Sequence, residues 1–169
     1  MMIRKQVLFE ARTFGYHNYR IPGMCVTADG AVVVTVEARK DEQGDYGNID
    51  IMSRTSEDGG LTFEQQRTII DHKDYGDAGV NNFVMIPLKD GSIRAVFSHD
   101  YLRVFTCISH DKGRSFENVK EITPAFDSIK SEYNWCVAAS GPGHGLQLRN
   151  GRLIIPVWLS DGSAGKDGA

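Results

Sequence analysis

The sequence predicts an all-β protein, a β-propeller built from repeated four-stranded sheets. Short β-branched and aromatic runs alternate with glycine and aspartate turns along the chain, without a convincing helical period. Turns of the type x-Asp/Asn-Gly, with glycines at Gly30, Gly91 and Gly151, recur about every 60 residues, a period that fits propeller blades. A second, eight-residue turn motif occurs twice in the same phase. Repeats of this length indicate sheets packed side by side around an axis.

Each of the three glycine turns is predicted to close a β-hairpin. Asp-Gly and Asn-Gly pairs supply the positive φ angles that tight hairpin turns need. Apolar runs precede and follow each turn, as a pair of antiparallel strands requires. The paired runs are 21–26 with 31–36, 83–88 with 92–97, and 145–148 with 152–158.

The eight-residue motif reads S-x-D-x-G-x-[ST]-F and occupies residues 56–63 and 109–116. Its aspartate can accept hydrogen bonds from backbone N–H groups of its own turn, and its glycine can adopt a left-handed conformation. Its aromatic residue anchors the turn to the sheet. We therefore expect a structural device, with no catalytic role for Asp58 or Asp111.

The repeats divide the chain, taken as one unit over residues 1–169, into about two and a half blades. Blade one covers about residues 19–71, blade two about 80–123, and a partial blade three about 140–169. A propeller closes to protect its sheet edges, and two and a half blades cannot close. We therefore expect the N-terminal portion of a longer protein, with an open edge that favours self-association. The expected strands pass through Ile21, Val32, Ile51 and Gln65, then Val84, Ala95, Val104 and Val119, and then Leu146 and Ile154.

Composition narrows the class of protein. A chain of 169 residues with 41% hydrophobic and 24% charged residues is typical of a globular domain. The net charge of −3 argues against nucleic acid as a partner. No run approaches the roughly 18 apolar residues needed to span a membrane. No apolar signal-peptide core follows the basic start, so we expect a cytoplasmic protein, or a secreted one whose leader has been removed.

Three cysteines, Cys25, Cys107 and Cys136, stand at wide spacings, and none has the C-x-x-C spacing of a metal site. Each lies in an apolar run, which predicts buried free thiols. We expect neither a metal nor an organic cofactor.

Two further motifs connect the repeats to a known family. Tyr19-Arg20-Ile21-Pro22 precedes the octets, and Gly141-Pro142-Gly143 opens a G-P-G-x-G-x-Q-L segment. With these motifs in this order, the chain resembles the exo-α-sialidases (neuraminidases) from about residue 19 to 158, and the octet resembles their Asp box. The resemblance implies a six-bladed propeller that hydrolyses terminal α-linked sialic acid from glycans, with retention of configuration. The Asp box alone is weak evidence for this family, because non-enzymatic propellers also contain it.

Sialic acid carries a carboxylate, which a planar guanidinium binds through two parallel hydrogen bonds. The resemblance makes Arg20 the first member of a three-arginine clamp. It places a further substrate-binding arginine at Arg39, and a catalytic acid/base at Asp45 on the loop that follows. That role requires a carboxyl group that protonates the glycosidic oxygen and later deprotonates water. Asp41 and Asp50 compete for it.

Other candidates have weaker support. In the family, the loop entering blade two contacts the sugar, which suggests Asp77 and Asn82 as substrate-binding residues, although this segment departs from the usual Asn-Pro pattern. Trp135 is expected either to line the pocket or to join the core. His144 has no visible partner, and we expect a structural place for it in the glycine-rich turn.

The remaining catalytic parts fall outside these residues. In the family, a tyrosine nucleophile, its partner glutamate and two clamp arginines come from later blades. We therefore expect little or no turnover from the isolated chain. Two alternatives stay open: a non-catalytic propeller that binds glycans or proteins, and a glycosidase for another anionic sugar, such as a deaminated sialic acid.

Overall fold

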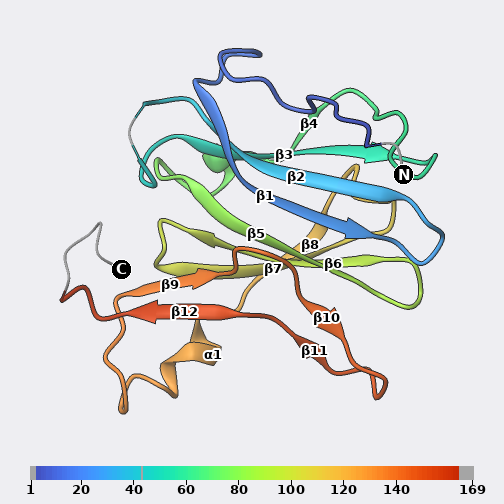
Figure 1. The fold of residues 1–169 in the computed structure, drawn as a ribbon. Coiled ribbons are helices and arrows are strands. Elements are labelled where there is room, and N and C mark those ends of the chain that lie inside the picture. The colour runs from blue at the N-terminus through green and yellow to red at the C-terminus, as the bar shows by residue number, and fades with distance from the viewer. Residues whose placement is uncertain (1–2, 43, 164–169) are drawn as a thin grey trace.

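The computed structural model describes residues 3–42 and 44–163 of the chain. These residues form two four-stranded antiparallel sheets and two two-stranded pairs, which follow one another from the N- to the C-terminus (Figure 1). The arrangement is that of a partial β-propeller. Within the described ranges, no helix has the length and apolar character needed to cross a membrane.

The first sheet has the order β1-β2-β3-β4, and the second has the order β5-β6-β7-β8. The first contains β1 (Asn18–Val26), β2 (Val32–Arg39), β3 (Ile49–Ser56) and β4 (Arg67–Ile70). The second contains β5 (Val80–Pro87), β6 (Ile93–His99), β7 (Arg103–Ser109) and β8 (Glu117–Glu121). The predicted strand at Gln65 is wrong by two residues, since β4 begins at Arg67.

The third unit contains more strand than the sequence suggested. The predicted hairpin is present as β10 (Leu146–Gln147) and β11 (Leu153–Ile154). It continues into a second pair, β9 (Val137–Ser140) with β12 (Val157–Ser160). Two short helices complete the described chain, η1 (His72–Asp74) and α1 (Pro124–Asp127).

The predicted turns have the expected backbone conformations. Gly30, Gly91 and Gly151 have φ angles of +91°, +87° and +86°. In the first octet, Asp58 accepts hydrogen bonds from the backbone N–H groups of Leu61 and Thr62, both at 2.9 Å. Asp111 makes the equivalent bonds in the second octet. The structural role expected for these aspartates is confirmed by these contacts.

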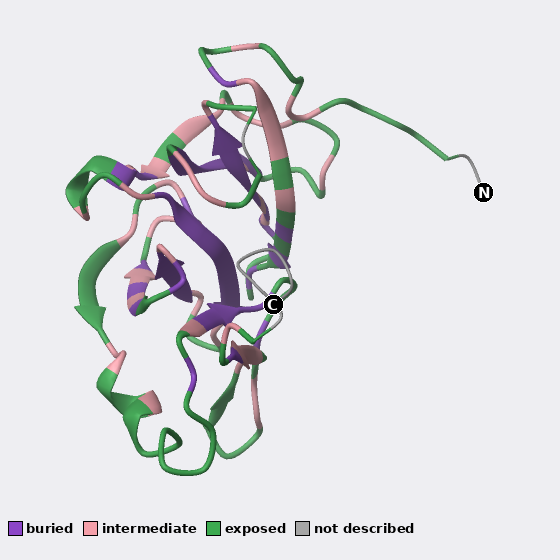
Figure 2. Ribbon diagram, turned by 90° about the vertical axis from the view of Figure 1, so that its left-hand side faces the viewer, coloured by how far each residue is buried: buried purple, intermediate pink, exposed green. Residues whose placement is uncertain are grey.

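The main core lies between the first two sheets, where buried strands face each other (Figure 2). Its centre is aromatic, with the rings of Phe97 and Phe105 stacked at 5.4 Å. Trp135 is 5% exposed and belongs to a second cluster beside blade three, so the structure places it in the core rather than in a pocket. Cys25 and Cys107 are buried as predicted. The prediction for Cys136 is wrong: its thiol is exposed, because it lies just before β9 at the surface.

Candidate active site at the bends of the inner strands

The innermost strand of each unit is interrupted at the same place. Pairing shifts between Arg20 and Gly23 in β1 and between Asn81 and Val84 in β5. Residues 141–145 separate β9 from β10 in the third unit. The residues at these bends have positive φ: Ile21 at +50°, Asn82 at +53° and Gly141 at +75°. Positive φ is uncommon for residues other than glycine, and bulges of this kind redirect side chains beside active sites.

The three bends lie close together in space. A Cβ atom added to Gly23 would stand 3.4 Å from the carbonyl oxygen of Phe83 and 3.9 Å from that of Gly143. The Ser140 hydroxyl donates to the carbonyl oxygen of Asn82 at 2.8 Å. An open depression of about 510 Å³ lies between the first and third bends, lined by Arg20, Ile21, Pro22, Pro142 and Gly143.

Arg39, the last residue of β2, is the anchor of the site. Its side chain is 2% exposed, and its Nε and Nη2 donate to Glu37 Oε2 at 3.1 and 2.5 Å. The other oxygen of Glu37 accepts the backbone N–H of Asn82 at 2.9 Å, which ties blade one to the bend of blade two. Burial opposes the charge of Arg39, but Glu37 and Asp45 outweigh it and raise the pKa of Arg39. The guanidinium is therefore charged and fixed.

Asp45 lies in front of both arginines. Its Oδ1 is 2.8 Å from Arg39 Nη1 and 3.5 Å from Arg20 Nη1. Its backbone carbonyl accepts a hydrogen bond from Asn81 Nδ2 at 3.2 Å. The carboxyl group of Asp45 is about half exposed, as is the Arg20 side chain. The structure thus brings three of the predicted site residues together, with an accessible carboxyl group between two guanidinium groups.

The two competing aspartates have other partners. Asp41 accepts hydrogen bonds from the backbone and side chain of Asn48 and closes the loop between β2 and β3. Asp50 is 1% exposed, with hydrogen bonds from the Tyr16 hydroxyl and the backbone N–H of His72. A buried and fully occupied carboxylate cannot reach a glycosidic oxygen, so Asp50 is not placed for the acid/base role.

Asp50, Asp71 and His72 also bring three potential metal-ligand atoms within 4.8 Å of one another. Hydrogen-bonding partners already occupy this group. The ammonium of Lys40 lies 3.2 Å from Asp50 Oδ2, and the His72 ring nitrogen Nδ1 lies 2.5 Å from Asp50 Oδ1. The negative charge of Asp50 is therefore already paired with the Lys40 ammonium, and both of its oxygens have partners within the protein.

The remaining predicted residues, Asn82, Asp77 and His144, differ in burial and in their place in the fold. Asn82 is buried in the bend of β5, and its backbone N–H holds Glu37. Asp77 is exposed on the segment between η1 and β5. His144 is exposed in the third bend, where it forms a parallel bridge with Met85. Substrate binding by Asp77 and Asn82 stays a prediction.

Sequence reasoning missed Glu37, Asn81 and Tyr101. Glu37 stands two residues before Arg39 in a strand whose other residues are apolar except Thr35, so both charged residues share one face, which was the available signal. The contact of Asn81 with the Asp45 loop could be predicted only by knowing the register of β5. Tyr101 is buried and has a φ of +55° in the β6–β7 turn, where Asp100 has +51°. Burial raises the pKa of Tyr101, and the charges of Glu37 and Asp45 add to this, because the ring lies beside the site.

Comparison with known proteins places these features in a family. The family described as "BNR repeat-like domain" matches residues 21–168. The chain belongs to this family. The chain is 49% identical over 55 residues to Sialidase-3 of Mus musculus. It is 22% identical over 177 residues to an exo-alpha-sialidase of Aspergillus fumigatus. These alignments cover 32% and 85% of this chain.

The fold also matches solved sialidase structures. A structure titled Trypanosoma rangeli sialidase in complex with sialic acid superposes with a TM-score of 0.70 at 18% identity, over 86% of this chain. The BNR-repeat chain spans less than half of each of these relatives: 12% of the mouse protein, 42% of the Aspergillus protein and 27% of the Trypanosoma chain. The likeness to the Trypanosoma structure covers most of this chain, so it supports the propeller fold and the way its blades are arranged.

Proposed function

We propose that the whole protein to which this chain belongs is a retaining exo-α-sialidase, and that this chain supplies the first part of its active site. The observation that carries the proposal is the convergence of Arg20 and Arg39 on one exposed carboxylate at the bends of the inner strands. The sialidase relatives support a sialylated glycan as the substrate. No metal or organic cofactor takes part in the proposed reaction.

In the proposed reaction, the carboxylate of the acidic sugar takes the place that the Asp45 carboxylate occupies between the two arginines. A guanidinium binds either carboxylate by the same charge-assisted hydrogen bonds. Because Glu37 holds the Nε–Nη2 edge of Arg39, and the carbonyl oxygen of Gly44 accepts from Nη1 at 2.6 Å, that guanidinium meets the ligand without reorganisation. Arg20, which is half exposed, adjusts to the ligand.

Asp45, released from the arginines, then protonates the glycosidic oxygen and later deprotonates the attacking water. The bound sugar excludes water from the loop, and loss of water favours the neutral form of a carboxyl group that donates a proton. The nucleophile and the remaining carboxylate-binding arginines are expected from other blades of the whole protein. The isolated 169-residue chain is accordingly expected to have little or no turnover.

The test is hydrolysis of a fluorogenic aryl sialoside by the full-length protein. General acid–base catalysis contributes roughly 10²–10⁴-fold, so Asp45→Ala should lower kcat by about that factor. Arg20→Ala removes a charge-assisted hydrogen bond worth about 1.5–3 kcal/mol, so kcat/KM should fall by roughly 10- to 100-fold. NMR of the first sugar released should show the α anomer.

Two matched surface changes serve as controls. Arg149→Ala and Asp127→Ala remove the same charges from exposed positions far along the chain, and both should leave the rate unchanged. An Arg20→Ala enzyme as active as the wild type would refute the assignment. A folded, inactive full-length protein that still binds sialosides would indicate a non-catalytic propeller, and preference for a deaminated sugar would indicate the related glycosidase.

A further inference from the structure

The loop that carries Asp45 is held at its tip by blade two. Its stems are fixed within blade one, where the backbone N–H of Lys40 donates to the carbonyl oxygen of Asn48 at 3.0 Å. The tip consists of Asp45, Tyr46 and Gly47, and each of these residues contacts blade two or the glycine that enters it. These contacts determine where the backbone of the proposed acid/base lies.

The first contact is a buried hydrogen bond to the backbone of Asp45 itself. Asn81 is 1% exposed, and its Nδ2 donates to the Asp45 carbonyl oxygen at 3.2 Å. Asn81 pairs with Ser98 of β6, so the sheet holds the residue that makes this bond. Because a buried donor that loses its acceptor is costly, the bond favours one position for the carbonyl group of Asp45.

The second contact is a close approach of two backbones. A Cβ atom at Gly79 would stand 2.6 Å from the carbonyl oxygen of Gly47 and 2.9 Å from Ile49 Cβ, so only glycine allows the loop to lie this close. The carbonyl oxygen of Gly79 accepts the backbone N–H of Asp100 at 3.1 Å. The segment under the loop tip is therefore joined to the β6–β7 turn.

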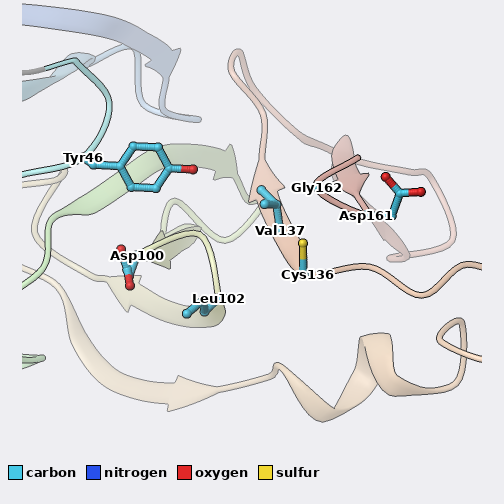
Figure 3. Close-up of a pocket in the computed structure, with 7 residues that line it drawn as sticks. All are labelled: Tyr46, Asp100, Leu102, Cys136, Val137, Asp161 and Gly162. Carbon is cyan, nitrogen blue, oxygen red and sulfur yellow. The ribbon is translucent and has the colours of Figure 1, made fainter. Parts of the chain in front are cut away.

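The third contact is aromatic and involves that turn. The ring of Tyr46 meets the ring of Tyr101 edge-on, with the centroids 5.3 Å apart, a favoured geometry for two aromatic rings. Figure 3 shows Tyr46 beside the turn, whose Asp100 and Leu102 line the same hollow. Tyr101 is 6% exposed, and its carbonyl oxygen accepts the backbone N–H of Ala138 at 2.7 Å. Tyr46 thus packs against a buried residue that is itself hydrogen-bonded to blade three.

We propose that blade two positions the acid/base. Asn81, Gly79 and Tyr101 fix the backbone of residues 45–47, so that the Asp45 carboxyl group moves between the arginines and the glycosidic oxygen by rotation of its own side chain. The inference rests on the proposed function, in which Asp45 protonates that oxygen. A misplacement of about 1 Å can lower a rate by roughly 100-fold, so a fixed backbone matters for this step. Asn81 and Tyr101 are positioning residues, which act through Asp45 without touching the substrate.

The first experiment is a double-mutant cycle on the full-length protein, with the aryl sialoside as substrate. Asn81→Ala should lower kcat by roughly 10- to 100-fold and leave KM nearly unchanged, because the arginines that bind the sugar carboxylate keep their places. In the Asp45→Ala background, the same substitution should change kcat by less than about twofold, since the group that Asn81 positions is absent. A merely structural role would lower kcat by the same factor in both backgrounds.

Ser53→Ala is the matched control. It also removes a buried donor to a backbone carbonyl of the next blade, but that carbonyl belongs to Gly113 in the second octet, so kcat should not change. Tyr46→Ala tests the same proposal at a partly buried position, where the fold depends less on the side chain. It should also lower kcat, whereas Tyr46→Phe, which keeps the ring contact with Tyr101, should retain most of the activity.

Hydrogen exchange provides a measurement that does not depend on turnover. The backbone amides of residues 44–48 should exchange faster in full-length Asn81→Ala than in the wild type, because the loop tip has lost its attachment. In Ser53→Ala they should exchange at the wild-type rate. Equal exchange in all three proteins would refute the proposed attachment of the loop.

The outcomes separate the two proposals. An Asp45→Ala enzyme as active as the wild type refutes the proposed function, whatever the effect of Asn81→Ala. If Asp45→Ala is impaired, wild-type activity of both Asn81→Ala and Tyr46→Ala refutes the positioning role alone. Equal losses from Asn81→Ala in the wild-type and Asp45→Ala backgrounds also refute it.

Discussion

The carboxylate of Asp50, at the base of the Asp45 loop, is contacted by three different residues. The Tyr16 hydroxyl and the Lys40 ammonium lie on Oδ2, while the backbone and ring of His72 lie on Oδ1. Lys40 begins the loop and its backbone N–H donates to the carbonyl oxygen of Asn48 at 3.0 Å, so the same group fixes both stems. Burial opposes ionisation of Asp50, but these hydrogen bonds outweigh it and lower its pKa.

We predict that Asp50→Asn destabilises the chain by about 1–3 kcal/mol at pH 7, since the amide loses the negative charge and keeps only one of the two oxygens that face Lys40 and His72. The folded-state pKa of Asp50 lies below the unfolded value of about 3.9. The stabilisation is therefore present above about pH 4 and is lost as the pH falls through the folded-state pKa. Urea unfolding of both proteins between pH 7 and pH 2 should show their difference shrinking in that window.

The control for this experiment is Asp127→Asn, whose ion pair with Lys130 lies on the surface at 3.6 Å. It should change stability by less than about 1 kcal/mol at every pH. A difference between wild type and Asp50→Asn that stays constant down to pH 2 would contradict the explanation.

Single site residues could be predicted from the sequence where a short local motif contained them. Arg20, Arg39 and Asp45 follow from short motifs, and the structure brings them together. Glu37 was missed because its role depends on a partner two residues along the strand and on the backbone of another blade. Tyr101 was missed because tertiary packing, rather than a glycine, stabilises its left-handed backbone.

The octet turns join neighbouring sheets as well as closing their own hairpins. Ser53 Oγ of β3 donates to the carbonyl oxygen of Gly113 at 2.9 Å, and Thr55 Oγ1 donates to that of Lys112 at 2.9 Å. Arg114 forms ion pairs with Glu57 and Glu64 of blade one. The second octet thus docks onto the first sheet.

We predict that Gly113→Ala destabilises the chain more than Gly91→Ala. Both glycines have positive φ, at +75° and +87°, so both substitutions strain the backbone by roughly 1 kcal/mol. Only at Gly113 would the new Cβ meet a neighbour, Val33 Cγ1, at 2.6 Å, which adds about 1–3 kcal/mol of overpacking. Equilibrium urea unfolding measures the difference.

A second substitution identifies the cause. Val33→Ala removes the atom that clashes, so Gly113→Ala should cost less in that background than in the wild type. Equal costs for the two glycine variants would mean that the octet does not pack tightly against blade one.

Whole elements were predicted well wherever a turn glycine joined two apolar runs, as at Gly30 and Gly91. The β9–β12 pair was not predicted, because residues 141–145 interrupt the run and leave only short segments on either side. Such a strand is recognised only when its hydrogen-bonded partner is known. The helix α1 is a single turn, below the length at which a helical period can be seen.

The molecule as a whole presents apolar side chains on both outer units. Met24 is 60% exposed and Leu61 is 56% exposed on the face of blade one. Leu146 and Ile154 are 47% and 46% exposed on the β10–β11 hairpin. In the described residues, β12 has one hydrogen-bonded neighbour, β9, and its other edge is unpaired. Unpaired edges and apolar faces favour association.

We therefore predict that the 169-residue chain associates in a concentration-dependent way. Light scattering coupled to size-exclusion chromatography should show a mass that rises with loading. Met24→Lys combined with Ile154→Lys should shift the equilibrium toward the monomer. The matched change Lys5→Met, at an exposed site near the N-terminus, should not. A wild-type chain that elutes as a monomer at all concentrations would contradict this prediction.

The shared bends at Ile21, Asn82 and Gly141 have a consequence for how such a protein can change. Each bend lies in the innermost strand of its unit. The rest of that strand pairs regularly with its neighbour, whereas the backbone of the bend leaves the hydrogen-bonded ladder. Pro22, for example, is exposed and lies between the paired residues Arg20 and Gly23, so a replacement there breaks no hydrogen bond of the strand ladder. New specificities can therefore arise there during evolution, or be introduced in the laboratory, without rebuilding the scaffold that supports them.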